Sequence, residues 1–148
     1  MGQMLRVLIV EDEILLAMDL EALIEDNGHV VVGEATSLFD VEKLDDNIAP
    51  QLALVDIQLA RNTNGLDACA LIRRRWPEAL VVFVTANLSK IPEDFCGAHG
   101  AVGKPFSHTG LASALSYLAE GVFNPPPGTP KPASLVASPH LEPRLTHA

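Results

Sequence analysis

The chain has 148 residues, of which 48% are hydrophobic and 20% are charged, with a formal net charge of −9 at pH 7. This length supports one domain with a real core, and the composition is typical of a soluble globular protein. The acidic balance makes nucleic acid a poor partner, because no basic segment offsets it.

Strand and helix patterns alternate from the N-terminus to about residue 121. Short apolar runs bounded by turn residues are typical of strands buried on both faces of a parallel sheet. The pattern therefore predicts an α/β fold in which helices cover both faces of a doubly wound parallel sheet. In chain order we expect a strand at 5–10, a helix at 13–27, a strand at 29–35, a helix at 38–47, a strand at 51–56, a helix at 65–76, a strand at 80–85, a short helix at 90–98, a strand at 100–103 and a helix at 107–121.

The composition changes after residue 121, where prolines become frequent, beginning with Pro125-Pro126-Pro127. Proline lacks an amide hydrogen and fixes one backbone dihedral, so this segment is unsuited to helix or sheet. We therefore expect a folded domain at 1–121, followed by a proline-rich tail at 122–148 that is extended or disordered.

Four of the predicted strands run into a charged or hydroxyl residue. The first leads to Glu11 and Asp12, the third to Asp56, the fourth to Thr85 and the fifth to Lys104. The carboxyl ends of parallel strands lie at the edge where open α/β sheets bind their ligands. We therefore expect all five side chains to surround a single point.

The three carboxylates among them indicate a cation site. Two anions about 4 Å apart repel by about 4 kcal/mol at an effective dielectric constant near 20, unless a cation lies between them. Hard oxygen ligands without nearby Cys or His suit Mg²⁺. Glu11 or Asp12 taken alone could simply cap the helix that follows. Asp56 at the end of an independent strand favours the metal interpretation.

A carboxylate beside a metal can also act as a nucleophile and form an aspartyl phosphate. Asp56 is the candidate, with Thr85 placed to hydrogen-bond a phosphoryl oxygen and Lys104 to neutralise another. Thr85 alone could be an ordinary strand-ending residue, and Lys104 an ordinary surface lysine. Gly103 and Pro105 instead indicate a tight turn around Lys104, for which we expect a cis Lys104–Pro105 bond.

Four motifs together resemble the receiver domain of two-component response regulators. They are Val10-Glu11-Asp12-Glu13, Val55-Asp56-Ile57, Val84-Thr85-Ala86 and Gly103-Lys104-Pro105-Phe106, in family-like order and spacing over about residues 5–121. The resemblance implies the flavodoxin-like receiver fold with strand order 2-1-3-4-5. It also implies a phosphorelay signalling switch, not a turnover enzyme, whose change of conformation is read by a partner protein.

The resemblance assigns a role to each site residue. Asp56 would accept a phosphoryl group from a histidine kinase or a histidine phosphotransfer protein, and Thr85 and Lys104 would contact that group. Asp12 and Asp56 would bind Mg²⁺ through their side chains and Gln58 through its backbone carbonyl. Glu11 would act on the metal mainly through water.

Three features depart from the family pattern. Ala101 stands where the family usually has an aromatic switch residue, so the usual relay from Thr85 is missing. The segment between Thr85 and Lys104 is short and contains Pro92 and Gly97. The loop at 58–65 differs from the common form and resembles a receiver subgroup paired with atypical alphaproteobacterial histidine kinases.

Other functions are still open at this point. A phosphatase with an aspartyl nucleophile usually carries a second Asp two residues later, where this chain has Gln58. A flavodoxin-like cofactor site needs a phosphate-cradling first loop, whereas Glu11-Asp12-Glu13 would repel phosphate. A phosphate sink that competes for a kinase and a docking module that works without phosphorylation are further alternatives.

The expected setting is the cytoplasm. Acidic residues interrupt the only apolar run near the N-terminus, so we expect no signal peptide, and no segment has the roughly 18 apolar residues of a membrane span. Cys69 and Cys96 are too few for a disulfide framework.

Overall fold

A six-stranded sheet forms the centre of the structure, a computed structural model that describes residues 4–146. The sheet order is β2-β1-β3-β4-β5-β6, in which the first five strands run parallel and β6 is antiparallel to β5. The predicted order 2-1-3-4-5 is therefore confirmed, and β6 is an addition. The strands are β1 Arg6–Val10, β2 Val30–Ala35, β3 Leu52–Val55, β4 Leu80–Thr85, β5 Gly100–Gly103 and β6 Val136–Ala137.

Three of the four α-helices in residues 4–146 begin at a polar cap that the sequence supplies. Ser37, Asn64 and Ser107 each accept a hydrogen bond from a backbone amide three residues later, which satisfies one of the free amides of a helix start. The α-helices are α1 Ile14–Asp26, α2 Leu38–Lys43, α3 Gly65–Arg75 and α4 His108–Phe123. Short 3-10 turns are η1 Asp46–Ile48, η2 Leu88–Lys90, η3 Phe95–Gly97 and η4 Glu142–Leu145. None of the helices within residues 4–146 is long and apolar enough to cross a membrane.

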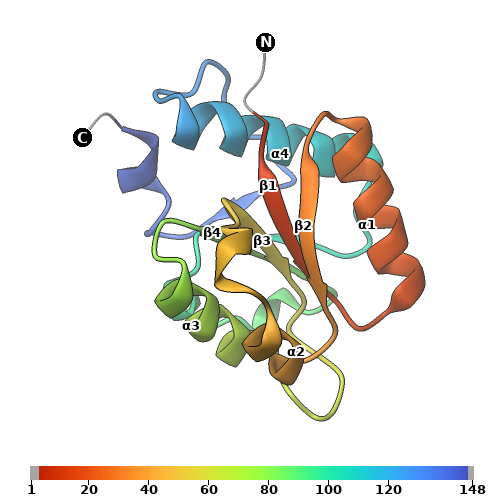
Figure 1. Ribbon diagram of the computed structural model, residues 1–148. Coiled ribbons are helices and arrows are strands. Elements are labelled where there is room, and N and C mark those ends of the chain that lie inside the picture. The colour runs from red at the N-terminus through yellow and green to blue at the C-terminus, as the bar shows by residue number, and fades with distance from the viewer. Residues whose placement is uncertain (1–3, 147–148) are drawn as a thin grey trace.

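Alternate residues of the strands fill two separate cores, one on each face of the sheet. Val7, Ile9 and Leu54 point into the core that α1 and α4 cover, whereas Leu8 and Val55 point into the core that α2 and α3 cover. Figure 1 shows these helix pairs on opposite sides of the sheet. Burial on both faces explains why these strands read as continuous apolar runs.

The predicted helix over 90–98 is wrong. This segment begins at the last residue of η2 and contains the 3-10 turn η3, with irregular chain between the two. Pro92 has no amide hydrogen to donate, and Phe95, Cys96 and Gly97 all have positive φ angles, which an α-helix does not allow. Ile91 and Phe95 nevertheless pack on the core beneath α3, so the segment still covers that edge of the sheet.

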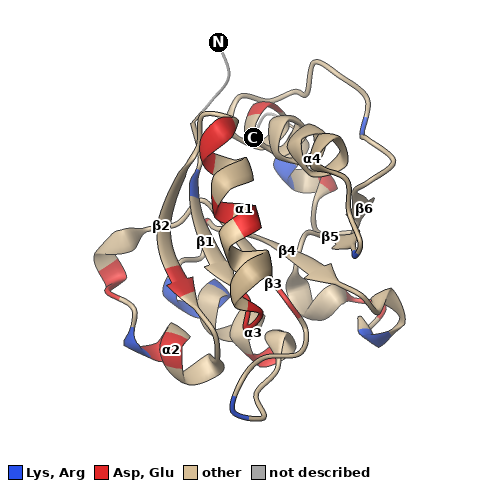
Figure 2. Cartoon of the chain, turned by 90° about the vertical axis from the view of Figure 1, so that its right-hand side faces the viewer, with Lys and Arg blue, Asp and Glu red and all other residues tan. Residues whose placement is uncertain are grey.

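The chain after α4 lies against the domain. The expectation that this segment is unsuited to a sheet is wrong at Val136–Ala137, which form β6 beside β5 (Figure 2). Leu135 and Leu141 are almost fully buried in the core that α4 covers. The prolines surround this short strand without occupying it, so they do not interrupt its pairing. The division of the chain near residue 121 stays a prediction.

Candidate functional site

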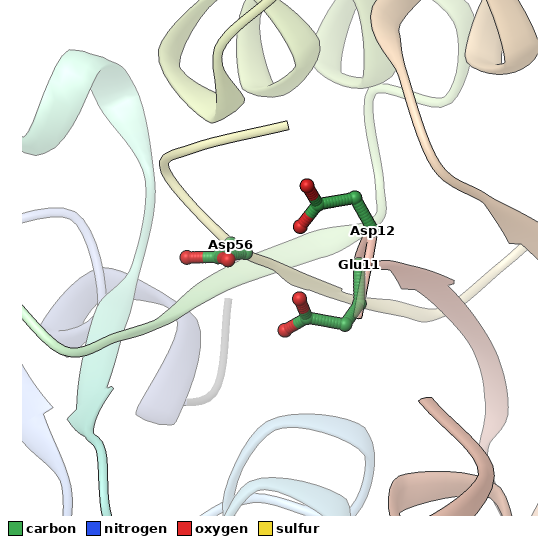
Figure 3. A group of neighbouring side chains, drawn as sticks. All are labelled: Glu11, Asp12 and Asp56. Atoms are coloured by element: carbon green, nitrogen blue, oxygen red, sulfur yellow. The ribbon is translucent and has the colours of Figure 1, made fainter. Parts of the chain in front are cut away.

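Three carboxylates meet at the carboxyl edge of the sheet. Glu11 and Asp12 directly follow β1, and Asp56 directly follows β3, so the parallel pairing of these two strands brings them together. Each offers an oxygen that lies within 4.8 Å of an oxygen of the other two. Figure 3 shows the three side chains grouped at this edge. Glu11 and Asp56 are buried, and Asp12 is the more exposed of the three.

Lys104 brings a positive charge into this cluster from the end of β5. Its Nζ donates hydrogen bonds to Glu11 Oε1 at 2.8 Å and to Asp56 Oδ2 at 3.3 Å, and lies 3.8 Å from Glu13 Oε1. Only 12% of the Lys104 side chain is exposed, so this lysine is part of the site and not a surface lysine. The Lys104–Pro105 bond is cis, as the sequence predicted.

Burial and charge act on these groups in opposite directions. Burial raises the pKa of Glu11 to about 7, even though its hydrogen bond with Lys104 lowers it, and the nearby Asp56 raises it further. Burial alone would lower the pKa of Lys104, but its bonds and charge interactions with Glu11 and Asp56 raise the pKa on balance. Three carboxylates therefore surround one ammonium, and an additional cation would favour the ionised form of Glu11 that burial disfavours.

The two oxygens of the Asp56 carboxylate have different partners. Oδ1 accepts a hydrogen bond from the backbone amide of Ile57 at 2.7 Å, and Oδ2 accepts the bond from Lys104. These contacts fix the orientation of the side chain at the end of β3.

Thr85 and Lys104 are connected through the ends of neighbouring strands. Thr85 lies opposite Gly103 in the sheet, and its carbonyl accepts a hydrogen bond from the Lys104 amide at 2.8 Å. The Thr85 hydroxyl accepts a hydrogen bond from the amide of Asn87 at 3.1 Å, and the residue is buried. The sheet thus brings β4 and β5 to the same edge as the carboxylates.

Gln58 lies two residues after Asp56, in the loop after β3. It forms an isolated bridge with Asn64 and lines a hollow of about 550 Å³ that Lys90 also borders. This loop is tied to the chain before α2, because Ala60 donates its amide to the carbonyl of Thr36 at 2.8 Å. The metal role of the Gln58 carbonyl stays a prediction.

Gly65 is a site residue that the sequence analysis did not identify. A Cβ at this position would lie 2.0 Å from the carbonyl oxygen of Asp56, so only glycine allows α3 to begin this close to the aspartate. The amide of Gly65 also donates to the carbonyl of Ile57 at 2.6 Å. The Asn64-Gly65 pair signals a helix start, but a sequence alone does not show which backbone atom lies beside it.

The residues present fit a magnesium ion. The donor set consists of hard carboxylate oxygens, and three carboxylates share the single ammonium of Lys104. Asp12 and Asp56 are the side chains that would hold the ion, and Glu11 would act on it mainly through water.

The sheet order defines a doubly wound α/β domain. Its carboxyl edge carries an acidic cluster together with a nearly buried lysine. The sequence profile of the family described as "Response regulator receiver domain" matches residues 7–116. The chain therefore belongs to the receiver domain family of two-component response regulators, as the motifs predicted.

Relatives and solved structures agree with this assignment. The chain is 38% identical over 116 residues to the phyllosphere-induced regulator PhyR of Methylorubrum extorquens, an alignment of 74% of this chain and 42% of PhyR. It is 32% identical over 112 residues to the transcriptional regulatory protein PdtaR of Mycobacterium tuberculosis, covering 74% of this chain and 54% of PdtaR. The chain thus spans about half or less of these relatives.

Among solved structures, the receiver domain of Erythrobacter litoralis PhyR is similar over nearly its whole length. The comparison covers 87% of this chain and 96% of that domain, with a TM-score of 0.70 and 30% sequence identity. The anti-anti-sigma factor PhyR of Bartonella quintana matches with a TM-score of 0.62 and 35% identity, over 76% of this chain and 46% of that protein. This chain thus corresponds to less than half of the Bartonella quintana protein.

Proposed function

We propose that this chain is a phosphorylation-dependent signalling switch in which Asp56 accepts a phosphoryl group from a histidine kinase or a histidine phosphotransfer protein. The observation that carries the proposal is the position of Lys104. A nearly buried ammonium holds Asp56 Oδ2 at 3.3 Å inside a group of carboxylates, at the edge of the sheet where ligands bind.

The reaction transfers one phosphoryl group between two side chains. A carboxylate oxygen of Asp56 attacks phosphorus, the bond between phosphorus and the donor histidine nitrogen breaks, and an acyl phosphate forms. A bound Mg²⁺ would neutralise charge on the phosphoryl oxygens during the transfer. Lys104 would offer its ammonium to one phosphoryl oxygen, and the Thr85 hydroxyl would donate to another.

An exposed apolar surface on α1 supports docking of a protein donor. Ile14, Leu15 and Met18 are 72%, 82% and 60% exposed, directly after Asp12 in the chain. Exposed apolar side chains grouped beside a reactive centre are a feature of protein contact surfaces. We infer that the phosphodonor packs on these residues while its histidine reaches Asp56.

The phosphorylated state would be read by a partner protein in the cytoplasm. Phosphorylation replaces the single charge of the Asp56 carboxylate by a phosphoryl group that carries about −1.5 to −2 charges, which would draw Lys104 away from Glu11 and move the end of β5. Nothing in this mechanism turns over a substrate, so we place the chain among switches and not among enzymes. The link to atypical histidine kinases belongs to the same proposal.

Phosphotransfer profiling tests this function. The full chain is incubated with a panel of autophosphorylated histidine kinases from its own organism, beside the Asp56→Asn variant. Asp26→Asn is the matched control, because Asp26 is an exposed carboxylate at the far end of α1. We expect rapid transfer from one kinase to the wild type and to the control only. Transfer to Asp56→Asn, or to no variant from any kinase, would contradict the proposal.

A further inference from the structure

The C-terminal segment continues the sheet beyond β5. In β6, Val136 lies opposite Ala101 and Ala137 lies opposite Gly100, in an antiparallel ladder. A Cβ on Gly100 would lie 2.8 Å from the carbonyl oxygen of Val136, so this glycine lets the two backbones approach. Without β6, β5 would be the edge strand, with its outer hydrogen-bonding groups open to another chain.

Two leucines anchor the segment on either side of β6. Leu135 is 0% exposed and Leu141 is 1% exposed, and both belong to the core that α4 covers. Leu145 adds a third apolar contact, because it lies against Gly121 of α4. Leu135, Leu141 and Leu145 thus pack on the core that α4 covers.

Polar contacts hold the backbone between these anchors. The buried Ser138 donates its hydroxyl to the carbonyl of Ala98 at 2.6 Å and its amide to the carbonyl of His99 at 3.0 Å. Ser134 donates its hydroxyl to the carbonyl of Gly110 at 2.7 Å. Most of these bonds join the segment to main-chain atoms of the domain, which is how an added strand is recognised.

We propose that residues 134–145 are a displaceable strap on a protein interaction surface formed by β5 and α4. The partner that this surface accepts presents an extended segment with leucines at the positions of Leu135 and Leu141, and it binds by strand addition. The ladder between the strap and β5 is only two residues long and Val136 itself is 42% exposed, so a partner has to replace chiefly the buried contacts of Leu135 and Leu141.

The inference goes beyond the proposed function and does not depend on phosphorylation. A strap that is docked about 99% of the time weakens the affinity of a competing segment about 100-fold. β5 contains the strap contact at Ala101 and leads directly into the site residue Lys104, which connects the two surfaces through one strand.

A peptide-binding experiment on the full chain tests the strap. The probe is a fluorescein-labelled peptide of residues 131–146, whose anisotropy is measured as the protein is added. Leu135→Asn with Leu141→Asn weakens the strap of the protein but leaves the surface of β5 and α4 intact. Val136→Asn is the matched control, because that side chain lies in the same strand and is exposed. We expect the double variant to bind the peptide at least tenfold more tightly than the wild type, and the control to bind like the wild type.

Two further measurements keep the result interpretable. Amide exchange of Ser138 in the wild type reports docking, and we expect protection that the double variant loses while amides of β1 and β3 keep theirs. If the double variant fails to fold, Ser138→Ala replaces it, with a smaller gain in peptide affinity. A folded variant that binds no more tightly than the wild type would overturn the proposal. So would an unprotected Ser138 amide in the wild type, or light scattering that shows the strap exchanged between two copies.

Discussion

The ammonium of Lys104 lies 3.3 Å from Asp56 Oδ2 and 2.8 Å from Glu11 Oε1, which makes this lysine a counterion built into the site. Both contacts reach across the carboxyl edge of the sheet, from the end of β5 to residues that follow β3 and β1. The same lysine therefore contributes to stability before phosphorylation and, on our account, to phosphoryl binding afterwards.

Lys104→Met is expected to lower the free energy of unfolding by about 2–3 kcal/mol, because it leaves buried carboxylates without a counterion. Mg²⁺ should restore more stability to this variant than to the wild type. Urea unfolding with and without Mg²⁺ measures both effects. Lys90→Met serves as the control, since Lys90 is exposed and its loss should cost no more than about 0.5 kcal/mol. Equal stability of Lys104→Met and the wild type would show that Lys104 is not a counterion.

Gly65→Ala should displace the backbone at Asp56. Its methyl group would lie 2.0 Å from the carbonyl oxygen of Asp56, so α3 or the end of β3 must shift. We expect a loss of at least about 2 kcal/mol in unfolding free energy, typical of overpacking, together with weaker phosphorylation of Asp56. Gly128→Ala is the matched control, because nothing lies within 4 Å of its added Cβ. Similar melting curves for the two variants would refute the close contact.

His99 should make the stability of the domain depend on pH. Burial lowers its pKa from 6.5 to about 4, and the nearby Arg144 adds to the shift. As the pH falls through 6.5, His99 becomes protonated in the unfolded chain but stays neutral in the folded protein. Stability from this group is complete above pH 6.5 and decreases by about 3 kcal/mol as the pH falls to about 4.

Urea unfolding across this pH range isolates the effect when the wild type is compared with His99→Asn. The Asn side chain can still accept the hydrogen bond that Val81 donates to His99 Nδ1 at 3.0 Å. The stability advantage of the wild type should shrink as the pH falls. An advantage that stays constant with pH would mean that His99 is protonated in the folded state as easily as in the unfolded one.

Leu15→Ser should separate donor docking from the chemistry of the site. Leu15 is 82% exposed, so its loss should change the unfolding free energy by less than about 0.5 kcal/mol. Labelling by acetyl phosphate should stay unchanged, whereas transfer from the cognate kinase should slow at least about tenfold. Unchanged transfer from that kinase would place the docking surface elsewhere.

The sequence was sufficient for the fold and for most of the site because the relevant signals are local. Apolar runs that end at Asp56, Thr85 and Lys104 mark both the strands and their shared edge. Gly65 and the strap escaped prediction for a different reason. The approach of Gly65 to Asp56 and the burial of Leu135 are contacts between distant segments, and a proline-rich composition hides a two-residue strand.

The helix over 90–98 is an element that the sequence predicted and the structure does not contain. Pro92 and Gly97 lie inside the predicted helix, and the positive φ angles at Phe95 and Cys96 are a further obstacle that the residue types do not announce. The segment of the missing helix and the strap both lie next to β5 and contact each other, since Ser138 donates to the carbonyl of Ala98. The part of the fold that the sequence predicted least well is thus the part next to the proposed interaction surface.

The most direct test of Asp56 as the phosphoacceptor is an amide NMR spectrum of the full chain with Mg²⁺ before and after addition of beryllofluoride, which mimics an aspartyl phosphate. We predict shifts concentrated between Thr85 and Phe106 in the wild type and none of them in Asp56→Asn. An unchanged wild-type spectrum, or the same shifts in Asp56→Asn, would contradict the account.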